Sequence, residues 1–430
     1  MTITNNNNIK DDFSQEVVYP YLFGVYLATN SVKGVYLLVD GPKCSQSKIE
    51  YIYPNHDINS DLINPWKIPR ILSTLTDPDT CFQDVEKNIF DKVSFLLKNE
   101  NPCLTLLNPM PHTTIISTDY ERILKSISKN TKFKYGILTN NSLTSDWLDG
   151  YIDTLEIISQ KMELKKKVKK KKKILIIGNP FYRNEYDFLG NVNELNKLFE
   201  EIGVEIYIWP QGNHLKDDEF NFADASIIIA LPHGIKSAKI ISQKLNIQYI
   251  ELPLPFGISS TNYFLRKIGE ILDSSKKIND IIRRNNNLIY SRTVKYISAI
   301  TSGTKSIVII DPLLEPYIED ILKICGIGIS EIIHTSKYID KNRIKSVKYI
   351  KRKINNFFSK ENANLLISPN LSPFYLYIRG YYFEFGFPNY RNHYLIETPF
   401  LGYNGFLFFI QQIVNTILLN KIKGERVYVK

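Results

Sequence analysis

Short apolar runs recur along the chain, and each one leads through a polar turn into a stretch with helical periodicity. The runs at residues 34–39, 174–177 and 306–310 are apolar except for Ser306, as expected for strands buried on both faces of a parallel sheet. Further strands are predicted at residues 103–107, 134–138, 204–208, 225–230, 247–252, 329–334, 347–350 and 365–367. Because strands that alternate with helices form βαβ units, the sequence predicts an α/β fold with parallel sheets.

The strand and helix pattern repeats as three successive α/β units. We expect a disordered tail over residues 1–15, a first domain over 16–160, a lysine-rich linker over 161–173, a second domain over 174–285 and a third over 286–430. The polar segment Asp280–Asn287 is interpreted as the boundary before the third unit. A helix is predicted over residues 191–203, with Asn191 and Glu194 placed as a capping box at its start.

The basic charge of the chain is concentrated in one segment. The formal net charge is +10 at pH 7, and it falls to +2 without the eight lysines of residues 165–173. Such a run is attractive to nucleic acid or an anionic membrane. No aromatic residues are interleaved with it, which favours a solvated linker and predicts neither partner.

From the first residues and the cysteines we expect a cytoplasmic protein. The first residues are polar and lack the apolar segment of a signal peptide. No apolar run reaches the roughly 18 residues of a membrane span. The cysteines are too few and too scattered for a disulfide scaffold, which suits a reducing compartment. They are Cys44, Cys81, Cys103 and Cys325.

The most distinctive stretch is Gly386–Leu419. It contains a Gly-Phe-Pro turn, a polar loop with His393, the segment Gly402–Gly405, and an apolar helix with polar breaks at Gln411/Gln412 and Asn415/Thr416. This order resembles the C-terminal signature of nitrogenase component 1 proteins. Other parts of the chain resemble the same family in the same order: Asn141–Tyr151, Ala223–Ile228 and Glu251–Leu265.

The resemblance implies three Rossmann-like domains with parallel sheets around a central cleft. It also implies pairing with a homologous component 1 subunit and electrons from an ATP-dependent iron–sulfur reductase. The expected function is that of a reductase subunit acting on a substrate in the cleft. A non-catalytic partner or a cofactor-assembly scaffold remains the alternative, and a hinged small-molecule-binding protein is a third. Whether the complex is a heteromer or a homodimer stays open.

The resemblance also suggests an iron–sulfur cluster, of the [4Fe–4S] type. Family members commonly offer three first-domain cysteines to it, and soft thiolates suit iron. Cys44 matches the middle position, whereas Tyr19 stands at the first and Met110 or Pro111 at the third. Cys81 and Cys103 lie in the same domain and are candidate replacements, although a cysteine that starts an apolar strand is often a core residue.

Two histidines are candidate catalytic residues. Nitrogen-reducing family members anchor a metal cofactor with a middle-domain cysteine and a last-domain histidine. Ala230 stands near the cysteine position, so nitrogen reduction with that cofactor is not expected. His393 lies near the histidine position, and both His393 and His233 suit proton donors near neutral pH. An ordinary loop histidine is the alternative interpretation of each.

Other motifs limit the cofactors. His56 and His112 lie on loops near the expected cluster and are candidate substitute ligands. No G-x-x-x-x-G-K-[ST] motif is present, so we expect no ATP site of that kind on this chain. No G-x-G-x-x-G follows a strand, and the α/β units therefore do not imply NAD.

Overall fold

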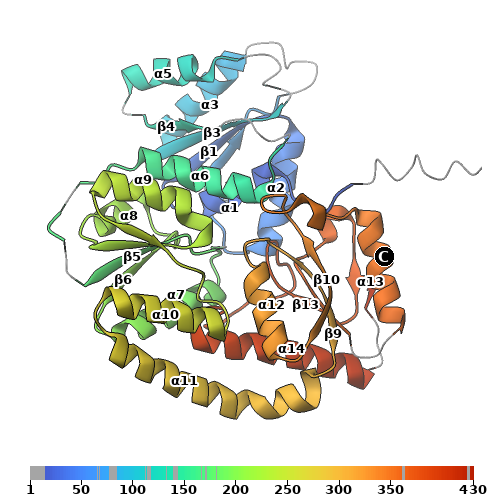
Figure 1. Cartoon of the computed structure of the whole chain (residues 1–430). Helices are drawn as coiled ribbons and strands as arrows, with labels where there is room; N and C mark the ends of the chain where they lie inside the picture. Colours follow the sequence, from blue (N-terminus) through green and yellow to red (C-terminus); the bar gives the residue numbers. More distant parts are fainter. Residues whose placement is uncertain are drawn as a thin grey trace, which may run out of the picture. The chain divides into compact units, whose positions relative to one another are not determined.

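The computed structural model describes residues 15–64, 66, 68–76, 85–111, 113, 118–131, 133–138, 144–165, 167–169, 172–180, 182–360, 364–423 and 427–430, so the expected tail lies almost entirely outside the described residues. Within these ranges the chain forms three four-stranded parallel sheets (Figure 1). It divides into two compact units. One comprises Pro20–Asn286 and His393–Phe406, and the other Met1–Tyr19, Asn287–Asn392 and Leu407–Lys430. The predicted α/β fold with parallel sheets is confirmed.

The first sheet has the strand order β2-β1-β3-β4. Its strands are β1 (Val35–Asp40), β2 (Ile71–Ser73), β3 (Leu104–Pro109) and β4 (Tyr135–Ile137). Its helices are α1 (Tyr21–Asn30), α2 (Lys43–His56), α3 (Val85–Asn99), α5 (Tyr120–Asn130) and α6 (Trp147–Lys161). Helices α3 and α5 cover one face, where Ile89, Val93 and Ile127 pack with Leu38 and Leu107 of the strands (Figure 1).

Helices α1 and α6 pack backbone against backbone. A Cβ atom on Gly24 of α1 would lie 1.7 Å from the carbonyl oxygen of Trp147, and one on Gly150 of α6 would lie 2.1 Å from that of Tyr21. All ten residues of α1 are buried. The apolar run that precedes β1 is therefore a central helix, and glycine is required where it meets α6.

The second sheet belongs to the same unit and has the order β6-β5-β7-β8. Its strands are β5 (Lys173–Ile177), β6 (Glu205–Trp209), β7 (Ile227–Ala230) and β8 (Tyr249–Glu251). Its helices are α7 (Tyr186–Glu200), α8 (Leu215–Phe222), the short η1 (Pro232–Gly234), α9 (Ile235–Leu245) and α10 (Ile258–Ile271). The strand order reverses between β5 and β7, and such a switch point is where open α/β sheets commonly bind ligands.

The third sheet lies in the other unit, with the order β10-β9-β11-β13. Its strands are β9 (Lys305–Ile310), β10 (Gly328–His334), β11 (Asn364–Ser368) and β13 (Phe383–Glu384), and β12 (Ile378–Arg379) pairs antiparallel with β14 (Tyr428–Val429). The remaining elements are α11 (Ser275–Tyr296), η2 (Ile297–Thr301), α12 (Glu315–Ile324), η3 (Lys341–Arg343), α13 (Val347–Lys360), η4 (Ser372–Phe374) and α14 (Gly402–Lys423).

Three local predictions differ from the structure, in whole or in part. Residues 347–350 begin helix α13 instead of a strand, because Ile350, Ile354 and Phe358 recur every four residues and are buried along one face. The segment Asp280–Asn287 is not a loop but part of α11, although the division between the two compact units falls within it, after Asn286. Helix α7 begins at Tyr186, so Asn191 and Glu194 lie inside it and form no capping box.

Two further expectations concern single elements. The polar breaks of α14 lie at its surface as predicted, since Gln411 and Asn415 are exposed whereas Ile413 and Ile417 are buried. No helix within the described ranges is long and apolar enough to cross a membrane.

Candidate functional site

Cys44 lies just beyond the carboxyl end of β1. It is the second residue of α2, after the turn Asp40-Gly41-Pro42, and it is exposed. Buried Asp40 anchors this turn by accepting hydrogen bonds from the hydroxyls of Tyr120 (2.6 Å) and Thr74 (2.8 Å). A Cβ on Gly41 would meet Cγ of Met110 at 2.4 Å. The Cys44 thiol is thus carried by a well-anchored turn and remains accessible.

Cys103 lies at the opposite edge of the same sheet. It precedes β3, which runs parallel to β1 with Val35 beside Leu104 and Asp40 beside Pro109. Six residues of strand span roughly 20 Å. The structure therefore does not bring Cys44 and Cys103 together. Sγ of Cys103 instead lies 3.8 Å from Nε2 of His214, and burial raises the pKa of this thiol.

The other cysteines and the two candidate histidines do not complete a set of metal ligands among the described residues. Cys81 and His112 lie outside the described residues. His56 is buried at the end of α2. Cys325 is buried in the other unit, where burial raises the pKa of its thiol to about 12. Among the residues that the structure describes, no three His, Cys, Asp or Glu side chains are grouped so that they could hold a metal ion.

The carboxyl edge of the second sheet gathers polar groups at its switch point. Gly178 follows β5 with a φ of 100°, and a Cβ there would meet the nitrogen of Gly234 at 2.4 Å. The next residue, Asn179, is fully buried, and neither its amide oxygen nor its amide nitrogen has a hydrogen-bond partner in the described part of the chain. A buried amide without partners is costly, and it marks a place where a ligand or water would be held.

His233 lies beside this position. It follows β7 in η1, is 1% exposed, and packs edge-on against the ring of Tyr151 with the centroids 6.5 Å apart. The hydroxyl of Tyr151 donates to the carbonyl oxygen of Asn179 at 3.3 Å. His233 is therefore a buried residue at the switch point, and it follows a strand, as the sequence predicted.

His393 forms a different group with the start of α7. Its Nδ1 lies 2.7 Å from Oε1 of Glu185, whose Oε2 accepts the backbone N–H of Tyr394 at 3.0 Å. Glu185 is buried, whereas the side chain of His393 is 36% exposed. Buried Arg183 completes the group, lying 3.5 Å from Glu185 and 2.9 Å from Asp187. A carboxylate at Nδ1 holds the proton on that nitrogen and leaves Nε2 as the accepting atom of the neutral ring.

Buried Asp57 and half-buried Asn184 form a hydrogen-bonded pair that the sequence did not predict. Oδ2 of buried Asp57 accepts from Nδ2 of Asn30 (2.8 Å) and from the backbone N–H (3.0 Å) and Nδ2 (2.9 Å) of Asn184. Its Oδ1 has no partner among the described residues, and burial raises the pKa of this carboxyl. The pair joins the end of α2 to the loop before α7. The polar segments that follow α2 and β5 were the available signal.

A sequence profile of nitrogenase component 1 type oxidoreductases matches residues 21–418, which is most of the chain. The chain belongs to this family. One subunit of the light-independent protochlorophyllide reductase of Chlorella vulgaris is 23% identical over 217 residues, which cover 48% of this chain and 42% of that protein. The match to the same subunit from Auxenochlorella protothecoides has the same extent. The aligned part thus spans less than half the length of these relatives.

Solved structures agree on the fold of this component 1 type chain. Nitrogenase Cp1 at pH 6.5 superposes with a TM-score of 0.73 at 14% identity, covering 99% of this chain and 96% of that one. Nitrogenase Cp1 at pH 5 gives a TM-score of 0.69 at 13% identity, covering 97% and 90%. At such identities the likeness shows the fold alone.

This component 1 type chain carries a tyrosine where the resemblance places the first cysteine of the family. Tyr19 is buried, its hydroxyl donates to the carbonyl oxygen of Asn370 at 2.7 Å, and its ring packs against Phe374. Burial raises the pKa of this phenol well above its ordinary value. Tyr19 is thus a packing residue of its own unit.

Proposed function

We propose that this chain is a subunit of a nitrogenase-like reductase complex, which takes electrons from an ATP-dependent iron–sulfur reductase and reduces a substrate. The observation that carries this proposal is the position of Cys44. Its thiol is exposed at the start of α2, beyond the carboxyl end of β1, where the family resemblance places a cluster ligand. An accessible thiol on an anchored turn suits a ligand shared with another subunit.

The described residues of one chain do not fit a complete [4Fe–4S] cluster. Such a cluster usually takes four thiolates, and Cys103 lies at the far edge of the sheet from Cys44. Cys44 then supplies one thiolate, and a homologous component 1 subunit supplies further ligands. Cys81 remains a second candidate on this chain.

His393 is the preferred proton donor of the proposed reaction. Reduction of an organic substrate consumes protons as well as electrons, and a positioned histidine delivers them near neutral pH. Glu185 orients the ring through Nδ1, and the side chain is partly exposed. His233 keeps a candidate role in proton supply, although its buried ring must act through a neighbour instead of touching substrate directly.

The test is the iron and acid-labile sulfide content of the chain purified anaerobically together with a homologous component 1 subunit. We expect iron in the wild-type complex, loss of that iron in Cys44→Ser, and retention in Cys103→Ser. The second variant is a matched control, because it removes one thiol from the opposite edge of the same sheet. Iron retained in Cys44→Ser, or absent from the wild-type complex, would contradict the proposed ligand.

A non-catalytic partner or assembly scaffold is the second candidate, favoured by Tyr19 at a family cysteine position. Reduction of the bound iron separates the two functions. In a reductase subunit, the ATP-dependent reductase changes the visible spectrum of the complex and substrate restores it. In a scaffold, the iron leaves the chain when an acceptor apoprotein is added, and no substrate-dependent change occurs.

A further inference from the structure

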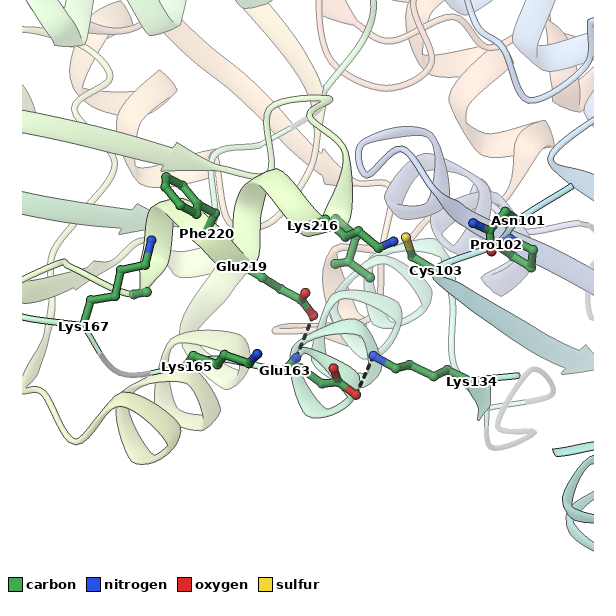
Figure 2. A pocket seen from close by; sticks show the side chains of 12 residues that line it. Asn101, Pro102, Cys103, Lys134, Glu163, Lys165, Lys167, Lys216, Glu219 and Phe220 are labelled. Atoms are coloured by element: carbon green, nitrogen blue, oxygen red, sulfur yellow. Dashed lines mark hydrogen bonds and ion pairs between the residues drawn. The ribbon is translucent and has the colours of Figure 1, made fainter. Parts of the chain in front are cut away.

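A pocket of about 450 Å³ opens at the amino edge of the first two sheets. One wall holds Cys103 and Lys134, just before β3 and β4, and the other is formed by α8 with Lys216 and Phe220 (Figure 2). The lysine-rich segment after α6 closes a further side with Lys165 and Lys167, so part of it borders a cavity. All lining residues lie in one unit.

Lysines outnumber acidic groups in this lining, four to two. Both carboxylates already have partners. Glu163 pairs with Lys134 at 2.7 Å, and Glu219 accepts the backbone N–H of Glu163 at 2.6 Å (Figure 2). The pocket therefore carries an excess of positive charge that its own acidic side chains do not neutralise.

Two of these four lysines are unpaired in the part of the chain that the structure describes. Lys165 and Lys216 have no ion pair or hydrogen bond within the described residues, and they come from separate elements, the segment after α6 and helix α8. Lys167 instead lies over the ring of Phe220, with Nζ 3.1 Å from the centroid. Phe220 is 67% exposed and gives the pocket an apolar surface.

We propose that this pocket binds a small molecule that carries two or more phosphate groups. Its volume falls in the range of small-ligand sites, roughly 300–1,000 Å³. Two separate ammonium groups suit two anionic groups, because lysine binds phosphate as a point charge. The organic part of the ligand packs against Phe220. The site lies at the sheet edge opposite to Cys44, so it is independent of the proposed redox role.

A long polyanion is the competing occupant, since the lysine run continues beyond the pocket through residue 173. The shape favours a small ligand. The free lysines line the same concavity as residues 101–103 of the opposite wall, whereas a nucleic acid strand needs an extended basic surface with stacking aromatics.

Calorimetric titration of the full chain with inorganic pyrophosphate tests the proposal. The variant Lys165→Gln/Lys216→Gln removes the two free charges, and we expect at least about tenfold weaker binding. The matched control Lys169→Gln/Lys172→Gln removes the same charge from the same run outside the pocket, and its affinity should stay within about twofold of wild type. Equal loss in both variants, or no binding by the wild type, would overturn the proposal.

Two further arms identify the ligand class. Citrate should bind at least about tenfold more weakly than pyrophosphate, and a single-stranded oligonucleotide should not displace pyrophosphate. Citrate that binds as tightly as pyrophosphate, or an oligonucleotide that displaces pyrophosphate, would overturn the phosphate assignment.

The alkylation rate of Cys103, which lines the pocket, tests the location of the site in the wild-type chain. Saturating pyrophosphate should slow this rate several-fold and leave that of exposed Cys44 unchanged, and an unprotected Cys103 would contradict the proposed location.

Discussion

Nδ1 of His393 lies 2.7 Å from Oε1 of Glu185, although 208 residues separate the two in the chain. Glu185 is the residue that precedes α7, and its second oxygen holds the backbone of Tyr394. The loop with His393 is thus attached at two points to the start of α7. The carboxylate of Glu185 therefore sets the tautomer of the His393 ring.

The first prediction concerns that tautomer. We expect the neutral ring of His393 to carry its proton on Nδ1, which long-range ¹H–¹⁵N correlation of the imidazole detects. Glu185→Gln should shift the ring towards the Nε2-protonated form and lower the free energy of unfolding by about 1–3 kcal/mol, because a buried charge-assisted hydrogen bond is lost. Glu200→Gln, an exposed change in the same helix, is the control. An unchanged tautomer in Glu185→Gln would refute the assignment.

The second prediction concerns pH and Asp218. This side chain is buried in α8, accepts hydrogen bonds from Tyr207 and Trp209, and burial raises its pKa from 3.8 to about 7. Between these two values the folded state keeps a proton that the unfolded state has lost. Its contribution to stability therefore declines as pH rises from about 4 to about 7, by at most about 4 kcal/mol.

Asp218→Asn is neutral at every pH and should lack this decline. Urea unfolding at pH 5 and pH 8 measures this decline. The unfolding free energy of the variant minus that of the wild type should be more positive at pH 8 than at pH 5. Asp91→Asn, an exposed change on α3, should track the wild type at both values. Parallel behaviour of Asp218→Asn and wild type would show that Asp218 does not hold a proton near neutrality.

The third prediction concerns the contact of α1 with α6. Gly24→Ala would place a methyl group 1.7 Å from the backbone oxygen of Trp147. The clash is with backbone atoms, so the two helices would have to move apart. We therefore expect a loss of about 3 kcal/mol or more in unfolding free energy. Gly328→Ala is the control, since its Cβ would have no neighbour nearer than 3.9 Å, and it should change stability by less than about 0.5 kcal/mol. Denaturant titration compares the two.

The fourth prediction concerns the start of α14. Glu194 of α7 accepts the backbone N–H (3.0 Å) and Nδ2 (2.7 Å) of Asn404, and Asn191 accepts the backbone N–H groups of Phe400 and Leu401. Glu194→Ala should cost about 1–3 kcal/mol and speed hydrogen exchange over residues 398–405. Lys197→Ala, exposed on the same helix, should do neither. Unchanged exchange in Glu194→Ala would contradict this capping role.

That capping role also shows where sequence reasoning ends. The apolar runs predicted most strands of the three sheets, because a fully buried parallel strand leaves a continuous hydrophobic signal. The short strands β2 and β13 were missed. The sequence predicted that Asn191 and Glu194 cap the start of their own helix, whereas in the structure they bind the backbone at residues 400, 401 and 404. Their partners lie about 210 positions away. A local pattern cannot reveal a partner that only the tertiary fold brings near.

The misread segments have a related cause. Val347–Ile350 looked like a strand because the window ended before Ile354 and Phe358 completed the helical spacing. For the site, sequence placed Cys44 after a strand and His233 at a sheet edge, as found. It could not show that Cys103 lies at the far edge, since that depends on strand direction and register.

The three sheets share one connectivity, in which the second strand flanks the first and the third and fourth follow on its other side. The chain is therefore a threefold internal repeat of one supersecondary plan, and the turns after β1, β5 and β9 occupy equivalent positions. Each contains a proline, Pro42, Pro180 and Pro312, but the polar residues beside it differ. A cysteine follows this turn only after β1, in Cys44. The equivalent turns thus present different polar groups: a thiol in the first copy, a buried amide in the second and a carboxylate, Asp311, in the third.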